Sequence, residues 1–298
     1  MNRSKAITLV VVTVATVALG STWALTAMSS KPVNNSQMME NSSSFHPVKA
    51  AVGLAGIHNL MLTENVLFIG THQGLWSQAT GKTATRISTS HFDVMGLAKV
   101  NGAMIASGHP AAGEENVHNL GFRTSMNGGV TWENTSLMGE VDFHRLTSSG
   151  NVVMGISASD GALMRSADAG KTWTTLANPG LYDLALDPTD SKIVIGTTQS
   201  GPLISKDGGK SFEVLPSSPI IALVSWDKAR LVGVTPAGVV HQSLDMGSTW
   251  KKLAAVPGGP MAITAKGDQI ALFAGTTVYY STDAGATFKE RITGVPGH

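Results

Sequence analysis

The chain has 298 residues and a formal net charge of +1; 42% of its residues are hydrophobic and 14% are charged. This balance argues against a nucleic-acid-binding surface, which usually shows as a stripe of clustered Lys and Arg. The sequence contains no cysteine, which excludes disulfides, thiol catalysis and thiolate-bound metals.

The N-terminus begins with two basic residues, Arg3 and Lys5, and continues with an uncharged apolar stretch, residues 6–28. A helix of about 20 apolar residues spans a bilayer, and flanking basic residues stay in the cytoplasm. We therefore predict an N-terminal transmembrane helix over residues 1–28, which anchors the chain with its remainder outside the cytoplasm, on the cell surface or in the periplasm. A cleaved signal peptide is the alternative, because small residues suited to cleavage occur at 18–20, and the protein would then be secreted.

A polar segment rich in Asn and Ser, residues 29–44, follows the apolar stretch. It has too few apolar residues to bury a core, so we predict a flexible linker. The folded domain is predicted to cover residues 45–298. From residue 57 onward, short β-type runs alternate with turn residues, which is typical of a sheet-only repeat protein.

One motif, Ser-x-Asp-x-Gly-x-Thr/Ser-Trp/Phe, recurs along the folded domain and is called the marker below. A decayed copy at Ser77 keeps Ser, Gly and Thr but has Ala79 and Ala84 in place of the acid and the aromatic residue. The interval from Ser77 to the next copy is 48 residues, and its surplus indicates an insertion at 108–119. The later copies follow at intervals of 41, 39, 38 and 38 residues, counted between Ser125, Ser166, Ser205, Ser243 and Ser281.

Six units of four strands, at a period near 40 residues, predict an all-β fold: a six-bladed β-propeller with four-stranded antiparallel blades. In the marker, the acidic side chain can accept main-chain N–H groups of the turn between the third and fourth strands. Gly permits the tight turn, and the aromatic residue can pack between blades. We therefore predict structural roles for Asn127, Asp168, Asp207, Asp245 and Asp283.

The marker is similar to the Asp-box, or BNR repeat, of sialidases, sortilin-type domains and photosystem assembly propellers, and the similarity covers residues 57–292. Segments 56–60, 71–75, 107–110 and 139–144 more narrowly resemble membrane-anchored bacterial propellers labelled as glycosyl hydrolases. The resemblance implies an extracytoplasmic propeller and a glycoside-hydrolase-like activity if the protein is an enzyme.

True sialidase activity is not expected from the arginine positions. Sialidases hold the substrate carboxylate with three converging arginines, a geometry suited to bidentate hydrogen bonding. Only six arginines follow the N-terminal segment, and Arg123 and Arg165 precede marker turns, which places them toward the opposite face.

Chemically active side chains concentrate at one end of the first three units. The first strands begin, and the second strands end, on the face opposite the marker turns. Histidines are absent from the equivalent positions of units four to six. The residues on this face include His91 and His118, and we predict ligand-binding roles for His58, His72, Asp93, His109, Arg145 and Tyr182.

Neutral His and carboxylates are the usual non-thiolate ligands of a divalent metal such as Zn, and they can also act as general acids and bases. The predicted metal ligands are His58, His72, His109 and His144, and the predicted catalytic residues are Glu140, Asp142 and His144.

Three functions remain open: a module that binds a metal, a glycan or an envelope protein; a glycosidase-like or metal-dependent hydrolase; and an assembly scaffold. In the plainest alternative, each His only caps a strand end.

Overall fold

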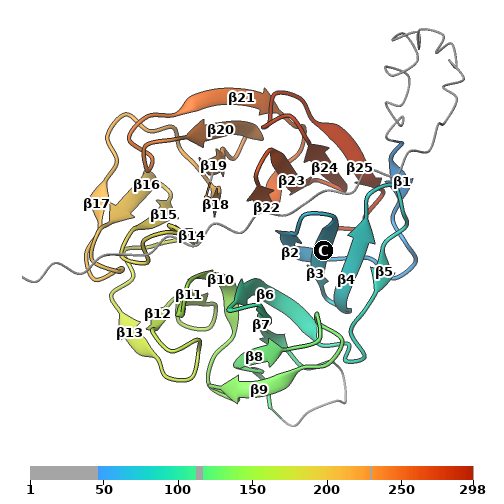
Figure 1. The fold of residues 1–298 in the computed structure, drawn as a ribbon, viewed down its shortest axis with the longest axis horizontal. Helices are drawn as coiled ribbons and strands as arrows, with labels where there is room; N and C mark the ends of the chain where they lie inside the picture. Colours follow the sequence, from blue (N-terminus) through green and yellow to red (C-terminus); the bar gives the residue numbers. More distant parts are fainter. Residues whose placement is uncertain (1–45, 112–116, 229, 298) are drawn as a thin grey trace, which may run out of the picture. The chain divides into compact units, whose positions relative to one another are not determined.

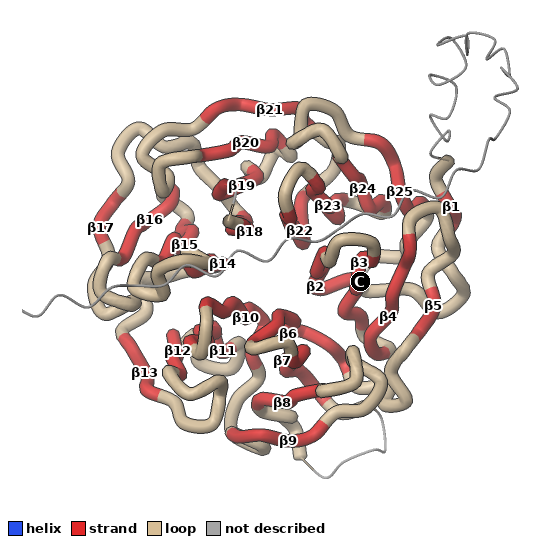
Figure 2. Tube along the Cα trace, viewed as in Figure 1, coloured by secondary structure: helices blue, strands red, loops and turns tan. Residues whose placement is uncertain are grey.

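The computed structural model describes residues 46–111, 117–228 and 230–297. These residues form strands, turns and loops (Figure 2), and among them no helix is long and apolar enough to cross a membrane. The predicted N-terminal helix (1–28) and linker (29–44) lie outside the described residues, as do Glu114 and Glu115 of the predicted insertion.

The strands form six sheets arranged around a common centre (Figure 1). Each sheet contains four consecutive strands that pair antiparallel with their neighbours, so the predicted six-bladed β-propeller is confirmed. The first strand of each blade lies nearest the centre and the fourth lies at the rim (Figure 1). All first strands therefore begin on the same face of the ring.

The first three blades contain the candidate site. Blade 1 consists of β2 (Ile57–Leu62), β3 (Val66–Thr71), β4 (Gly74–Ala79) and β5 (Thr85–Arg86). Blade 2 consists of β6 (Asp93–Val100), β7 (Ala103–His109), β8 (Phe122–Ser125) and β9 (Glu133–Ser136). Blade 3 consists of β10 (Phe143–Ser149), β11 (Val152–Ser157), β12 (Leu163–Ser166) and β13 (Thr174–Leu176).

The last three blades complete the ring. Blade 4 consists of β14 (Asp183–Leu186), β15 (Val194–Thr198), β16 (Gly201–Ser205) and β17 (Glu213–Val214). Blade 5 consists of β18 (Leu223–Asp227), β19 (Arg230–Val234), β20 (Val239–Ser243) and β21 (Lys251–Ala255). Blade 6 consists of β22 (Pro260–Lys266), β23 (Gln269–Ala274), β24 (Thr277–Ser281) and β25 (Lys289–Thr293), with β1 (Val48–Lys49) at its outer edge.

The hydrophobic core is divided among the six junctions between neighbouring blades, with one cluster of buried side chains at each. At the junction of blades 2 and 3, the Trp173 ring lies 5.2 Å from the Phe122 ring and 4.9 Å from the Phe143 ring. Trp173 also donates a hydrogen bond to Ser136 Oγ of the preceding blade (3.0 Å). Burial of this apolar surface holds each blade to the next.

Hydrogen bonds that involve the first strands also join each blade to the next. In five junctions, a side-chain oxygen accepts the main-chain N–H of a residue in the next first strand. At the remaining junction, Asn59 Nδ2 donates to the main-chain oxygen of Met95 (3.2 Å). The five N–H donors and their acceptors are Phe143 to Ser107, Leu186 to Thr147, Val224 to Asp183, Ala265 to Ser225, and Leu62 to Thr264.

The marker turns lie at the opposite end of the blades and are stabilised by their own side chains. Asp168 Oδ1 accepts hydrogen bonds from the main-chain N–H groups of Lys171 (3.1 Å) and Thr172 (2.9 Å), and Oδ2 accepts one from Thr172 Oγ1 (2.6 Å). These bonds lower the pKa of Asp168 to about 2. The carboxylate is thus occupied within its own turn.

Blades 6 and 1 close the ring through a strand pair and a buried cation. Strand β1 pairs parallel with β25, with Val48 opposite Ile292. Arg291 is 2% exposed; its Nε donates to Gln78 Oε1 of blade 1 (2.6 Å) and its Nη2 donates to the Gln78 main-chain oxygen (3.0 Å). Its guanidinium carbon lies 4.4 Å from the centre of the Tyr280 ring.

Candidate functional site

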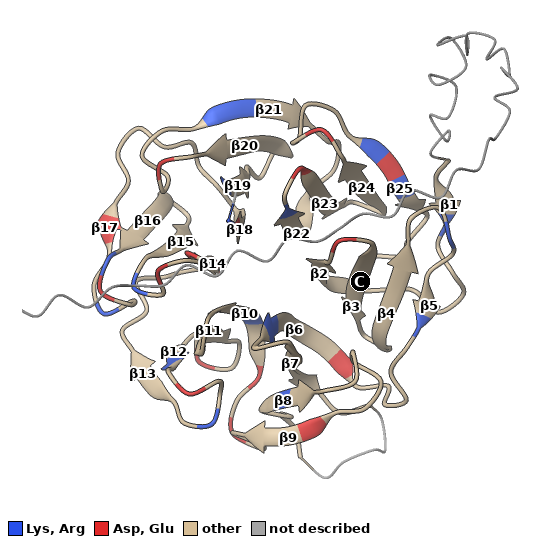
Figure 3. Ribbon diagram, in the orientation of Figure 1, with Lys and Arg blue, Asp and Glu red and all other residues tan. Residues whose placement is uncertain are grey.

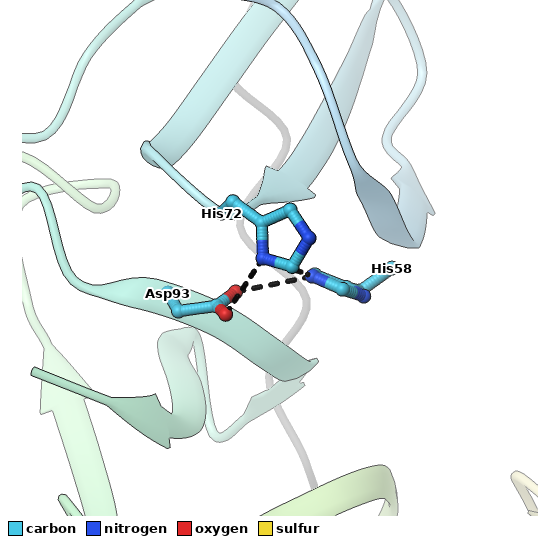
Figure 4. Close-up of side chains that lie close together, drawn as sticks. All are labelled: His58, His72 and Asp93. Carbon is cyan, nitrogen blue, oxygen red and sulfur yellow. Dashed lines mark hydrogen bonds and ion pairs between the residues drawn. The ribbon is translucent and has the colours of Figure 1, made fainter. Parts of the chain in front are cut away.

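Two clusters of side chains lie where the first strands of blades 1 to 3 begin. Cluster A consists of His58, His72 and Asp93 (Figure 4), and cluster B consists of His109, Asp142 and His144. In each cluster, every residue offers one nitrogen or oxygen atom, and these atoms lie within 4.8 Å of one another. Each cluster therefore has the donor set and the compactness of a metal site.

Irregularities in the inner strands position two of the histidines. The pairing of β2 with β3 shifts register between Ile57 and Asn59, which leaves His58 as the extra residue. The pairing of β10 with β11 shifts between Phe143 and Arg145, which leaves His144 in the same situation. A β-bulge re-aims the side chain of its extra residue. The bulge thus explains how each His reaches a neighbouring acid.

The other four residues come from repeated positions at the junctions. His72 directly follows the second strand of blade 1, and His109 ends the second strand of blade 2. Each faces an acid of the next blade: His72 Nδ1 lies 2.8 Å from Asp93 Oδ2, and His109 Nε2 lies 3.0 Å from Asp142 Oδ2. Because Asp93 and His109 are paired across β6 and β7, blade 2 contributes to both clusters.

The donor atoms of cluster A lie at distances typical of neighbouring metal ligands. His58 Nε2 lies 3.1 Å from Asp93 Oδ1 and 3.1 Å from His72 Nδ1 (Figure 4). For comparison, two ligands 2.0–2.1 Å from a tetrahedral zinc ion are roughly 3.3 Å apart. Burial tends to raise the pKa of Asp93, but hydrogen bonds from His58 and His72 outweigh it and lower that pKa. Asp93 is therefore a carboxylate at neutral pH.

The carboxylate of cluster B, Asp142, is more deeply buried than that of cluster A, Asp93. The Asp142 side chain is 3% exposed, and its Oδ2 lies 2.6 Å from His144 Nε2. Within the described part of the chain, Asp142 Oδ1 is buried without a hydrogen-bond partner. Leaving such an oxygen unpaired costs about 1–3 kcal/mol, more for a charged group. Both imidazoles face Oδ2, so a cation held there would be bound by Oδ2 and would neutralise the buried carboxylate.

A main-chain contact sets the tautomer of His109. Its Nδ1 lies 3.2 Å from the main-chain oxygen of His118, which can only accept, so Nδ1 carries the proton of the neutral ring. The Nε2 lone pair then points toward Asp142, an arrangement that needs a shared proton or a cation. A carbonyl that fixes the far nitrogen is the usual support of a metal-bound His.

Three of the predicted residues do not join the clusters. Arg145 turns toward Asp183 (Nε to Oδ1, 3.4 Å) and lines a central cavity of about 290 Å³ together with His58. Tyr182 is 57% exposed on blade 4. Glu140 is exposed in the turn before Asp142, and its carboxylate is not among the donor atoms of cluster B.

Two contributors to this face are not among the predicted site residues. Asp183 is buried; burial raises its pKa more than Arg145 lowers it, and its Oδ2 accepts the N–H of Val224 (2.9 Å). Its place directly after Tyr182, at the start of a first strand, was the available signal. The other is the His118 carbonyl, for which a side-chain pattern offers no signal.

Comparisons with known proteins show the fold. No protein-family model and no curated protein matches the chain. Among solved structures, it is similar to a chain of the nidogen/laminin complex (TM-score 0.59, 13% identity, covering 78% of this chain and 96% of that one). It is also similar to YCF48 bound to a D1 peptide (TM-score 0.52, 17% identity, covering 80% and 81%).

Two similar chains are much longer. An ancestral GH74 enzyme has a TM-score of 0.51 and 12% identity, and the match covers 79% of this chain and 37% of that one. The extracellular domain of a putative one-component system of B. thetaiotaomicron has a TM-score of 0.56 and 12% identity, covering 84% and 35%. These neighbours are β-propellers. At such low identities, the likeness extends to the fold alone.

Proposed function

We propose that this protein is a propeller that binds transition-metal ions through clusters A and B. The observation that supports this most is the buried Asp142 carboxylate between two imidazoles, with one oxygen unpaired. A buried charge is retained in proteins when it is paired or coordinates a metal. Both clusters offer two His and one carboxylate, a set that suits Zn²⁺ among the common divalent ions.

A metal-dependent hydrolase is the second candidate. Three protein ligands leave a coordination position for water, and a bound zinc ion lowers the pKa of that water to about 7. Asp142 and His144, predicted as catalytic residues, would then act as ligands. The exposed position of Glu140 weakens a two-carboxylate glycosidase mechanism, which needs both acids to flank the scissile bond.

The cellular setting is proposed from the sequence. The apolar stretch at 6–28 supports a membrane-anchored domain outside the cytoplasm, and the marker spacing supports an Asp-box type of repeat. A glycan or an envelope protein would bind the cluster face, whereas the partners of an assembly scaffold would bind the rims of the blades.

Elemental analysis of the full chain, purified in detergent without chelators, tests the metal proposal. We expect up to two equivalents of metal, and the loss of about one in either His109→Ala/His144→Ala or His58→Ala/His72→Ala, because each pair removes two of three ligands. His241→Ala, outside both clusters, is the control and should retain full occupancy. The proposal fails if wild-type protein dialysed against Zn²⁺, Cu²⁺, Ni²⁺ or Mn²⁺ holds no stoichiometric ion.

A further inference from the structure

A second concentration of functional groups lies on the opposite face, between the marker turns of blades 3 and 4. These turns border a hollow of about 550 Å³. Four cations line it: Arg165 from β12, Lys192 from the loop before β15, and Lys206 and Lys210 from the blade 4 marker turn. Figure 3 shows Lys and Arg in blue near β12 and β17. We call this the basic hollow.

The acid that lines the basic hollow is engaged in its own turn. Asp207 Oδ1 accepts the N–H groups of Lys210 (3.0 Å) and Ser211 (3.0 Å), and Oδ2 accepts Ser211 Oγ (2.6 Å). These hydrogen bonds hold the pKa of Asp207 well below its usual range. Lys206 pairs with Glu213 at 3.6 Å, but both side chains are exposed, so the pair contributes little. The local charge is therefore positive, although the whole chain carries only +1.

Among the residues that the structure describes, the Arg165 side chain forms no hydrogen bond or ion pair. Its Nε is buried without a hydrogen bond in the described part of the chain. The blade 4 turn passes directly over the guanidinium: a Cβ on Gly208, whose φ is +80°, would lie 3.3 Å from Nε and 3.7 Å from Nη2. An unpaired, partly desolvated guanidinium is the preferred partner of an oxyanion, because its N–H groups match two of the oxygens.

We infer that the basic hollow binds a ligand with repeated phosphate groups, such as a segment of a phosphate-containing polymer. Arg165 would donate paired hydrogen bonds to one phosphate, while the three lysines act as point charges for its neighbours. The volume of the hollow lies in the range of sites for small molecules or polymer segments rather than single ions. This site is independent of clusters A and B, which lie on the other face.

Calorimetric titration of the full chain in detergent with inorganic tripolyphosphate tests the inference. EDTA is present throughout, so that metal at the clusters does not contribute. We expect saturable binding that weakens with added salt, and at least about a tenfold loss of affinity in Arg165→Gln and in Lys192→Gln/Lys206→Gln/Lys210→Gln. The matched control, Lys251→Gln/Lys252→Gln/Lys289→Gln, removes the same charge from the outer strands of blades 5 and 6 and should change affinity by less than about threefold.

Two further titrations separate the alternatives. The His109→Ala/His144→Ala variant should bind tripolyphosphate like the wild type, which keeps this inference distinct from the metal proposal. A short poly-glutamate peptide should bind more weakly than tripolyphosphate at equal charge. Equal effects of the two triple variants would overturn the inference, as would stronger binding of poly-glutamate, which would indicate an acidic protein partner. Thermal melts confirm that each variant is folded.

Discussion

Asp168 and Asn127 occupy equivalent positions in their markers and show what a marker turn needs from one side chain. Asn127 Oδ1 accepts the N–H of Thr131 (3.0 Å), and its Nδ2 donates to Thr131 Oγ1 (2.8 Å). Asp168 makes the corresponding contacts with a carboxylate. The turn therefore requires an acceptor for main-chain N–H groups, and a negative charge is not essential.

This equivalence predicts the effects of two substitutions. Asp168→Asn should keep the turn and lower the melting temperature less than Asp168→Ala, which removes the acceptor. The pKa of Asp168 is lowered from 3.8 to about 2. A carboxyl group whose pKa is lower in the folded state than in the unfolded state stabilises the fold at pH values above its unfolded-state pKa. That contribution is lost as the pH falls through the folded-state pKa. Thermal melts at pH 7 and between pH 4 and pH 2 should thus show a smaller fall in melting temperature on acidification for Asp168→Asn than for the wild type. Equal acid dependence in both proteins would contradict this account.

At the level of the strands, room for cluster A depends on a glycine. Gly56 precedes β2 with φ +59°, and a Cβ there would lie 2.0 Å from His72 Cδ2. Blade 1 thus has a glycine just before its first strand, whereas Asp142 immediately precedes the first strand of blade 3. The absence of a side chain leaves space for the imidazole that faces Asp93.

Gly56→Ala should displace His72 and reduce metal occupancy at cluster A, while leaving cluster B unchanged. The matched control is Gly81→Ala: its φ is +72°, so the backbone strain is similar, but no atom lies within 4 Å of the added Cβ. Elemental analysis should show about one equivalent lost only in Gly56→Ala. If Gly81→Ala loses as much, the effect comes from backbone strain rather than from the contact with His72.

The blades could be predicted from the spacing of the repeat, whereas the contacts within the clusters depend on backbone geometry that residue types do not encode. Marker spacing gave the number of units, and strand alternation placed His58, His72 and His109 on one face. The bulges that leave His58 and His144 as extra residues, and so let each ring reach its acid, have no signal in the residue types. The ion pair of Arg145 with Asp183 likewise could not be predicted, because Asp183 belongs to the next blade.

At the scale of the whole ring, closure depends on Arg291. Arg291→Ala removes the two hydrogen bonds to Gln78 and the contact with Tyr280, and leaves a buried void. We expect a loss of about 2–4 kcal/mol in the free energy of unfolding, measured by denaturant titration. Arg86→Ala, at an exposed position of β5, should change it by less than about 0.5 kcal/mol. Similar losses in both variants would rule out a special role for the buried cation.

The pairing of β1 with β25 sets the order in which the ring can be completed during synthesis. Blades 1 to 5 each form from strands that leave the ribosome one after another. Val48, in contrast, can pair with Ile292 only after a further 244 residues have been synthesised (292 − 48). Contacts this distant in sequence form late, because the intervening chain must first become ordered. Among the described strands, the first to emerge is thus the last to pair, and premature termination in blade 6 would leave β1 with no edge to join.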